Sequence, residues 1–221
     1  MNELAVENAK RKIKAVIQEG LDQNIISQSE FLAMSADDKD PARFYCNFKV
    51  HKEHAHKQPP PPRPIISGSE SLTDNIGTYL EHHIKDITKK PESYLQDTPD
   101  FLRTINHINK GPKLNERTVL VTIDAIGLFT NIVHEEGLQC LKDSLEKRNN
   151  PEVPTNFLLQ LMQLILTNNI FVFHDALWKQ NIGAAMGSRP VPSYADNCMA
   201  KLDKIIKALE GAEDIKLLKK F

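Results

Sequence analysis

The chain has 221 residues, enough for one well-buried domain with an appended arm, and its 40% apolar and 26% charged content is ordinary for a globular protein. With 28 basic against 29 acidic side chains, the composition excludes a strongly basic protein, so any surface for a polyanion must come from local clustering of cations. The three distant cysteines exclude a disulfide framework, and no apolar run approaches the ~18 residues of a membrane span. We therefore expect a soluble, intracellular chain without membrane contacts.

The first 90 residues predict helices on both sides of a β-hairpin. Apolar residues recur at helical spacing in 3–19, and Gly20 is a typical helix end. Residues 43–51 and 64–67 predict two paired strands, joined by the extended, proline-rich connection KEHAHKQPPPPR. A capping-type stretch, SLTDN, then opens an amphipathic helix within 68–90.

The rest of the chain is predicted to be mainly helical, with one more hairpin. Further helices are expected at 101–108, 135–148, 155–166 and 192–206. The helix at 155–166 is apolar nearly all round, which is typical of a buried helix. A second hairpin is expected at 170–180, where IFVFH and LWKQ flank a turn.

The stretch 118–134, TVLVTIDAIGLFTNIVH, contains a candidate metal-binding carboxylate. Its β-branched, apolar first half, Thr118 to Ile123, predicts a buried strand, and Asp124 follows at the C-terminal end of that strand. A carboxylate there is costly to bury unless a charged group faces it, and a divalent cation is a common partner. The same pattern fits a turn residue that closes a strand, and the stretch alone does not decide between the two.

Two other segments carry residues suited to phosphate. Four cations surround the first hairpin: Lys49, Lys52, Lys57 and Arg63. Basic side chains on a hairpin suit phosphate contacts, and they fit a solvated loop equally well. Gly183 and Gly187 predict a flexible loop whose backbone can approach a ligand, just before a helix that begins at Pro192-Ser193. Such a loop can hold phosphate, although it lacks the lysine of a P-loop.

In their order along the chain, these blocks resemble the reverse transcriptases of Penelope-like retroelements. The resemblance rests on FYCNFKVHK, RPIISGSESLTDNI, LQDTPDFL, strand-Asp-x4-Phe-Thr-Asn-Ile-x-His, LTNNIFVF and G-x-A-M-G-x-R-x-x-P-S-Y-A, and it covers roughly residues 40–206. It implies a helix-rich α+β fold, the fingers and part of the palm of a right-hand polymerase, with a partial antiparallel sheet. Residues 1–40 are then a helical arm with a linker, 41–206 an incomplete reverse transcriptase domain, and 207–221 a helical tail.

The resemblance also implies roles for single residues. Asp124 matches the first catalytic, metal-binding aspartate of the palm, which would hold Mg²⁺. Lys49 and Arg63 match positions that hold the incoming dNTP, and Phe129 matches an aromatic that excludes a 2′-hydroxyl by steric clash. Template and primer contacts are expected from Lys52, Gly183, Met186, Gly187, Arg189, Pro192 and Ser193. The implied partners are an RNA template and an RNA–DNA hybrid, and the family expectation for location is the nucleus.

Part of the family pattern has no match in the sequence. The third palm motif, a hairpin with paired aspartates (Y-x-D-D), is not found, Gly127 stands where serine is usual, and Pro190-Val191 replace Met-Ala. Because Asp124 alone would leave two Mg²⁺ mostly to water and substrate, we expect a truncated or decayed copy that is catalytically inactive by itself. The missing hairpin would leave an open palm edge, so we also expect marginal stability or a protein partner that covers this edge.

Two other functions stay open on the sequence. One is a non-catalytic nucleic-acid-binding module that keeps its template contacts through Lys49, Lys52, Arg63 and Arg189. The other is a helical protein-interaction module in which Asp124 only closes a strand. If the chain is an interaction module, we expect no cleft that joins Asp124, Arg63 and Gly187. The tertiary structure therefore tests this alternative.

Overall fold

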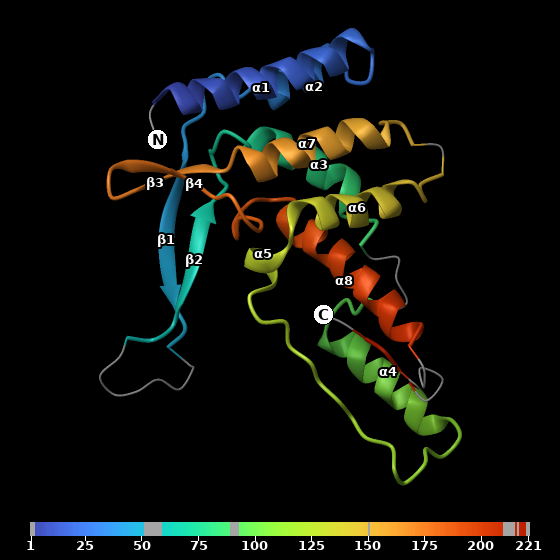
Figure 1. Cartoon of the computed structure of the whole chain (residues 1–221). Helices are drawn as coiled ribbons and strands as arrows, with labels where there is room; N and C mark the ends of the chain where they lie inside the picture. Colours follow the sequence, from blue (N-terminus) through green and yellow to red (C-terminus); the bar gives the residue numbers. More distant parts are fainter. Residues whose placement is uncertain are drawn as a thin grey trace.

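A computed structural model describes residues 3–50, 59–88, 93–149, 151–209, 215 and 217–219. These residues form eight helices and one four-stranded sheet, which confirms the predicted α+β class (Figure 1). The strands are β1 (Ala42–Phe48), β2 (Pro62–Ser67), β3 (Ile170–Phe173) and β4 (Ala176–Lys179), in the order β2-β1-β3-β4. The two predicted hairpins, β1–β2 and β3–β4, are antiparallel, whereas β1 and β3 pair in parallel, so the sheet is mixed.

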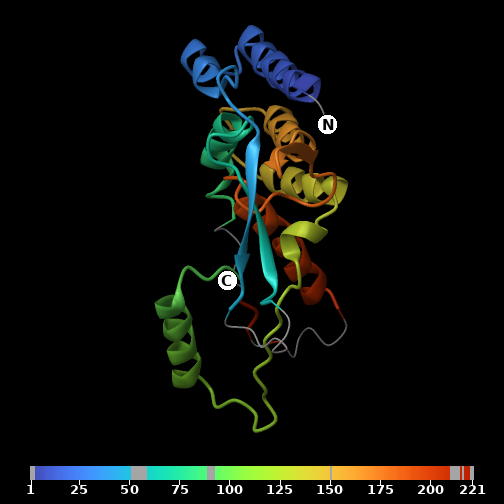
Figure 2. The same cartoon turned by 90° about the vertical axis from the view of Figure 1, so that its left-hand side faces the viewer.

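The helices agree with the periodicity of the sequence. They are α1 (Glu3–Asp22), α2 (Gln28–Met34), α3 (Asp74–Ile84), α4 (Thr98–Lys110), α5 (Leu128–Asn131), α6 (His134–Leu145), α7 (Thr155–Thr167) and α8 (Val191–Lys207). The sheet lies at one side of the helical body, and the β1–β2 hairpin extends away from it (Figures 1 and 2).

Helix α7 is the centre of the hydrophobic core. Its Leu158, Leu161 and Met162 are fully buried, and the helix packs against α1, α3 and α6. Because α7 carries apolar side chains on nearly all of its faces, other helices can pack against it from several directions. The N-terminal helix α1 contributes Ile13 and Ile17 to this same core.

Helix α1 continues past Gly20, so the predicted helix end at Gly20 is wrong. Gly20 is buried, and a Cβ atom there would lie 2.6 Å from Cε2 of Phe157 on α7. The close approach of α1 to α7, and not a change of backbone conformation, therefore explains this glycine.

The predicted buried strand at 118–123 is also wrong. This segment has no regular secondary structure, and its apolar side chains are exposed, 77% for Val119 and 88% for Ile123. β-branched residues favour a strand only where a neighbouring strand and a core face are available. The four strands of the described sheet pair with one another and not with this segment.

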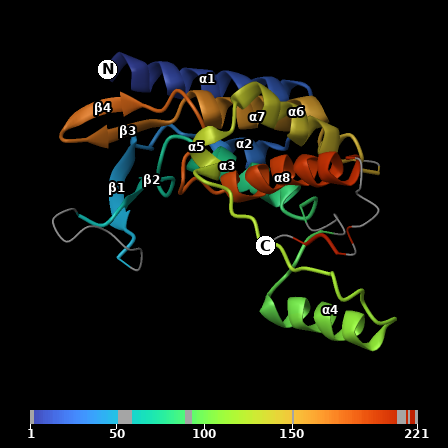
Figure 3. The same ribbon diagram turned by 60° about the horizontal axis from the view of Figure 1, so that its bottom comes forward.

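Helix α4 and the following segment to residue 126 form an arm that lies apart from the helical body (Figures 1 and 3). The helix has an apolar stripe that includes Phe101, Ile105 and Ile108, yet none of its residues is buried. The arm therefore carries apolar surface that the described part of the chain does not cover.

The contact between α6 and α8 yields a prediction in which two effects have opposite signs. A methyl group at Gly137 of α6 would overlap the hydroxyl of Tyr194, which is fully buried, and would lie 2.8 Å from Cγ2 of Ile132. In an uncrowded helix, replacing glycine by alanine stabilises by up to about 1 kcal/mol. Here we expect Gly137→Ala to lower the free energy of unfolding by about 1–3 kcal/mol, because overpacking dominates.

Urea denaturation followed by circular dichroism measures this change. Gln139→Ala, at an exposed position of the same helix, is the matched control and should shift the unfolding free energy by less than about 0.5 kcal/mol. A stabilised Gly137→Ala protein would show that α6 and α8 are farther apart than described.

Candidate nucleic-acid interface

Three segments that are distant in the sequence meet at a groove beside the sheet. The groove has a volume of about 200 Å³. It is lined by Phe44, Pro64, Ile66, Thr130, Phe171, Gln180, Ala184 and Met186. One wall is the sheet, and the other is formed by α5 and the glycine loop, which we define as residues 181–190. The lining is mainly apolar, so the groove suits a flat, weakly polar group better than a bare ion.

The glycine loop is bonded to the edge of β2. The backbone N–H of Ile66 donates to the carbonyl of Met186 at 3.0 Å, and that of Gly68 donates to the carbonyl of Gly187 at 3.1 Å. Gly187 has a φ of 121°, and a Cβ atom there would lie 2.5 Å from the carbonyl oxygen of Ile66. The sequence predicted that glycine permits close approach of backbone to a ligand, but in this structure the close approach is to the protein's own strand.

The same loop is attached to α5, which brings Phe129 and Gly183 together. The N–H of Ala184 donates to the carbonyl of Phe129 at 2.7 Å, and Nε2 of His134 lies 2.7 Å from the carbonyl oxygen of Gly183. Gly183 has a φ of 71°, which favours glycine. The Phe129 side chain is half-buried against the main core. These contacts hold the wall of the groove in place.

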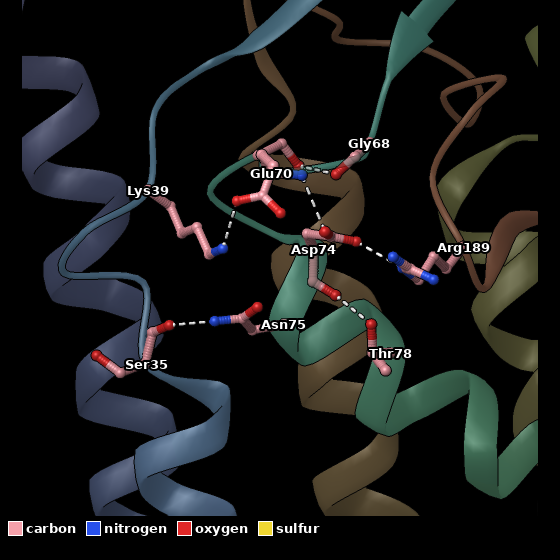
Figure 4. Close-up of polar contacts among 9 residues, drawn as sticks. Ser35, Lys39, Gly68, Glu70, Asp74, Asn75, Thr78 and Arg189 are labelled. Carbon is pink, nitrogen blue, oxygen red and sulfur yellow. Dashed lines mark hydrogen bonds and ion pairs between the residues drawn. The ribbon is translucent and has the colours of Figure 1, made fainter.

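Arg189 connects the glycine loop to the start of α3 (Figure 4). Its Nε donates to Oδ1 of Asp74 at 2.7 Å, and the Asp74 side chain is only 7% exposed. Oδ2 of Asp74 accepts from the backbone N–H of Glu70 at 2.9 Å, and the Glu70 carboxylate pairs with Lys39 at 2.9 Å. The Arg189 side chain, expected to contact template, is half-exposed and also has this internal role.

Sequence reasoning missed Asp74 as a partner of Arg189. It lies in the stretch SLTDN, which predicted a helix start, and the sequence carried no signal that pairs it with a residue 115 positions later. The two residues meet because the glycine loop lies against the end of β2.

Ser193 and Pro192 occupy the first turn of α8. The hydroxyl of Ser193, which is buried, donates to Oε1 of Glu81 on α3 at 2.9 Å. Oε2 of Glu81 is buried without a hydrogen-bond partner among the described residues. Burial raises the pKa of the Glu81 carboxyl, since desolvation disfavours its charged form. Pro192 is exposed beside Ser193.

Strand register places the predicted phosphate ligands on the face of the sheet opposite the groove. Arg63 pairs with Asn47, whereas its neighbour Pro64 lines the groove, and successive residues of a strand point to opposite faces. The same alternation continues to Lys49, whose N–H bonds the carbonyl of Pro61 at 2.9 Å. Lys49 and Arg63 therefore share one face of the hairpin. Lys52 lies outside the described residues.

Asp124 lies in the exposed segment before α5. No group of three or more His, Cys, Asp or Glu side chains that could hold a metal ion occurs in the described part of the chain. Two-metal chemistry needs several carboxylates that bridge the ions. The described residues around Asp124 therefore do not fit a two-Mg²⁺ site.

The groove contains none of Asp124, Arg63 and Gly187 themselves. Direct neighbours of two of them, Pro64 and Met186, do line it. The structure thus brings the hairpin and the glycine loop to one groove, while Asp124 stays outside its lining.

No family model matches the chain, and no curated protein matches it either. Within the described ranges, no helix has the length and apolar character needed to cross a bilayer. The function must therefore be inferred from the residues of this chain and their arrangement.

The Arg189–Asp74 pair gives a stability prediction. Arg189→Ala removes the guanidinium from a buried carboxylate, and we expect the free energy of unfolding to fall by about 1–3 kcal/mol. Adding Asp74→Asn should recover part of the loss, because the uncompensated charge is then gone. Urea unfolding of both variants measures the difference.

The control is Arg103→Ala, which breaks an exposed pair with Asp100 at 3.4 Å and should cost less than about 0.5 kcal/mol. Equal losses in the Arg189→Ala and Arg103→Ala proteins would contradict the role of Arg189 as the partner of the buried Asp74 carboxylate.

Glu81 gives a prediction about pH. Its pKa is raised in the folded state above the ordinary value of 4.5, so the contribution of its neutral form to stability is fully present below pH 4.5 and is lost as pH rises through the folded pKa. We expect the free energy of unfolding of Glu81→Gln to increase relative to that of the wild type as pH rises from 4 to 7. The reason is that only the wild type acquires a buried charge at position 81.

Thermal or urea unfolding across this pH range, with Glu136→Gln at an exposed position of α6 as control, measures the effect. A stability difference that stays constant between pH 4 and pH 7 would contradict burial of the Glu81 charge.

Proposed function

We propose that the chain is the fingers and part of the palm of a reverse transcriptase of the Penelope-like type, and that it holds template nucleic acid without a complete metal site of its own. The observation that carries this proposal is the groove. Its lining comes from segments that resemble the family: the β1–β2 hairpin, the α5 segment that follows Asp124, β3, and the glycine loop before α8. A shared groove is what a common ligand of these blocks requires.

The charge of the sheet supports a polyanionic ligand. The chain as a whole has a net charge of −1, yet four cations lie on or beside the four strands: Arg43, Lys49, Arg63 and Lys179. The described strands themselves contain no acidic residue, and Asp175 lies in the turn between β3 and β4. Local clustering of this kind attracts nucleic acid even when the whole chain is close to neutral.

The role that follows for these residues is binding and positioning. Lys49 and Arg63 act on phosphates, where arginine can form paired hydrogen bonds and lysine acts as a point charge. The wall formed by α5 and the glycine loop is held by internal hydrogen bonds, so it presents a fixed surface to bases and sugars. Binding of Mg²⁺ and dNTP would require further carboxylates in addition to Asp124.

The uncovered arm favours a second role, in protein interaction. Exposed apolar side chains follow one another between residues 119 and 126, including Leu120 at 80% and Ile126 at 92% exposure. A protein partner that supplies a strand would satisfy both the apolar surface and the unpaired backbone of this segment.

Binding of a labelled RNA–DNA hybrid tests the nucleic-acid proposal. We expect Lys49→Ala/Arg63→Ala to weaken binding about tenfold at low salt and to reduce the slope of log K against log[salt] by about 1.5, since two phosphate contacts are lost. Fluorescence anisotropy at several salt concentrations measures both quantities. Lys12→Ala/Lys201→Ala, which removes two exposed cations from α1 and α8, is the matched control and should leave the slope unchanged.

Absence of hybrid binding at low salt, or binding that is indifferent to Lys49 and Arg63, would contradict the proposal. A primer-extension assay with Mg²⁺ and dNTPs on the same hybrid examines the catalytic part separately. We expect no extension by this chain, and template-dependent synthesis that Asp124→Ala abolishes would overturn that expectation.

A further inference from the structure

Aromatic side chains form a continuous row across three strands of the sheet. Phe171 pairs with Trp178 across β3 and β4, and the parallel register of β1 with β3 places Phe44 beside Phe173. The Phe44 ring lies 5.7 Å from that of Phe171 and 4.9 Å from that of Phe173. Because directly paired residues share a face, these four rings lie on the same face of the sheet, which we call the aromatic face. Phe44 and Phe171 also line the groove.

The outer part of the aromatic face is open to solvent. Trp178 is 53% exposed and Phe173 is 40% exposed, although Phe44 and Phe171 are half-buried beneath the groove. The indole N–H of Trp178 donates to the carbonyl of Phe173 at 3.3 Å, which restricts the orientation of the exposed ring. The β3–β4 hairpin extends from the body beside β1 (Figure 1). Two exposed rings that adjoin two half-buried ones are more than the scattered apolar residues of an ordinary surface.

The cations of the sheet lie on its other face. Arg43 pairs with Val172, and Lys179 pairs with Ile170, so both side chains alternate away from the aromatic rings, as Arg63 does. The thickness of a single sheet, which separates these cations from the aromatic face, is comparable to the distance of about 8 Å over which charges act at physiological salt. A ligand that combines negative charge with flat apolar rings matches this arrangement.

We propose that the aromatic face binds unpaired bases of single-stranded RNA or DNA, which stack on Trp178 and Phe173 and continue into the groove over Phe171 and Phe44. The inference rests on the proposed function and adds to it the strandedness of the ligand. Stacking on aromatic rings tolerates any sequence because every base has a π-face, and it requires that the bases be unpaired. A paired hybrid can meet the cations through its backbone but cannot stack its bases on this face.

Trp178 provides a direct reporter, because it is the single tryptophan of the chain. The experiment titrates the full chain with oligo(dT) and oligo(rU) of about 12 nucleotides, and separately with a blunt RNA–DNA hybrid of the same length. Tryptophan fluorescence reports contact with the aromatic face, and anisotropy of a labelled oligonucleotide reports binding. We expect the single strands to quench Trp178 in a saturable way and the blunt hybrid to bind without comparable quenching.

Variants separate stacking from charge. We expect Trp178→Ala and Phe173→Ala each to weaken single-strand binding on the order of tenfold, and Trp178→Phe to retain most of it, because a ring remains. Hybrid binding should be nearly unchanged in all three. The matched control is Tyr45→Ala, which removes a 47% exposed ring from the opposite face of β1 and should leave single-strand binding unchanged.

The outcomes distinguish this inference from the proposed function. Hybrid binding through Lys49 and Arg63 together with unquenched Trp178 would overturn the stacking surface and leave the proposed function standing. Absence of binding to both ligands would overturn both. A Trp178 emission that shifts with protein concentration alone, together with a larger sedimenting species, would show that the aromatic face contacts another protein chain and would also overturn the proposal.

Discussion

Two backbone hydrogen bonds hold the β1–β2 hairpin and the glycine loop together. They join Ile66 to Met186 and Gly68 to Gly187, and they form only because Gly187 has no Cβ to meet the carbonyl of Ile66. Through them the β1–β2 hairpin is placed against the start of α8, and the groove exists between the two. A larger residue at 187 would separate the strand from the loop and open the groove. The ion pair between the half-exposed Arg189 and the buried Asp74 secures the same junction a few residues later.

The sheet has two chemically different faces as a direct result of strand alternation. Cations at Arg43, Arg63 and Lys179 alternate with aromatic or apolar neighbours, so these cations share one face with Tyr45 while Phe44, Phe171, Phe173 and Trp178 lie on the other. The β1–β3 pair is essential to this separation, because it sets Phe44 of one hairpin beside Phe173 of the other. Neither hairpin alone carries the whole aromatic row.

The arm formed by α4 and residues 111–126 carries apolar side chains that the described part of the chain leaves exposed. Its segment at 118–123 has the composition of a strand, but a strand is stable only where another strand accepts its hydrogen bonds. Asp124 follows this segment, is exposed like it, and is not among the residues that line the groove. Among the described residues, no cluster of His, Cys, Asp or Glu side chains around Asp124 could hold a metal ion.

The sequence by itself determined the elements whose signals are local. Helices α7 and α8 and both hairpins were predictable, because periodicity, prolines and turn residues act over a few positions. The tertiary structure decided everything that depends on a distant partner. It left 118–123 unpaired, buried Gly20 against Phe157, paired Asp74 with Arg189, and turned Arg63 away from the groove that Pro64 lines. The physical reason is the same in each case. Whether a residue is buried, what it pairs with and which face of a sheet it occupies depend on two segments that meet in space, and a local stretch of sequence contains only one of these two segments.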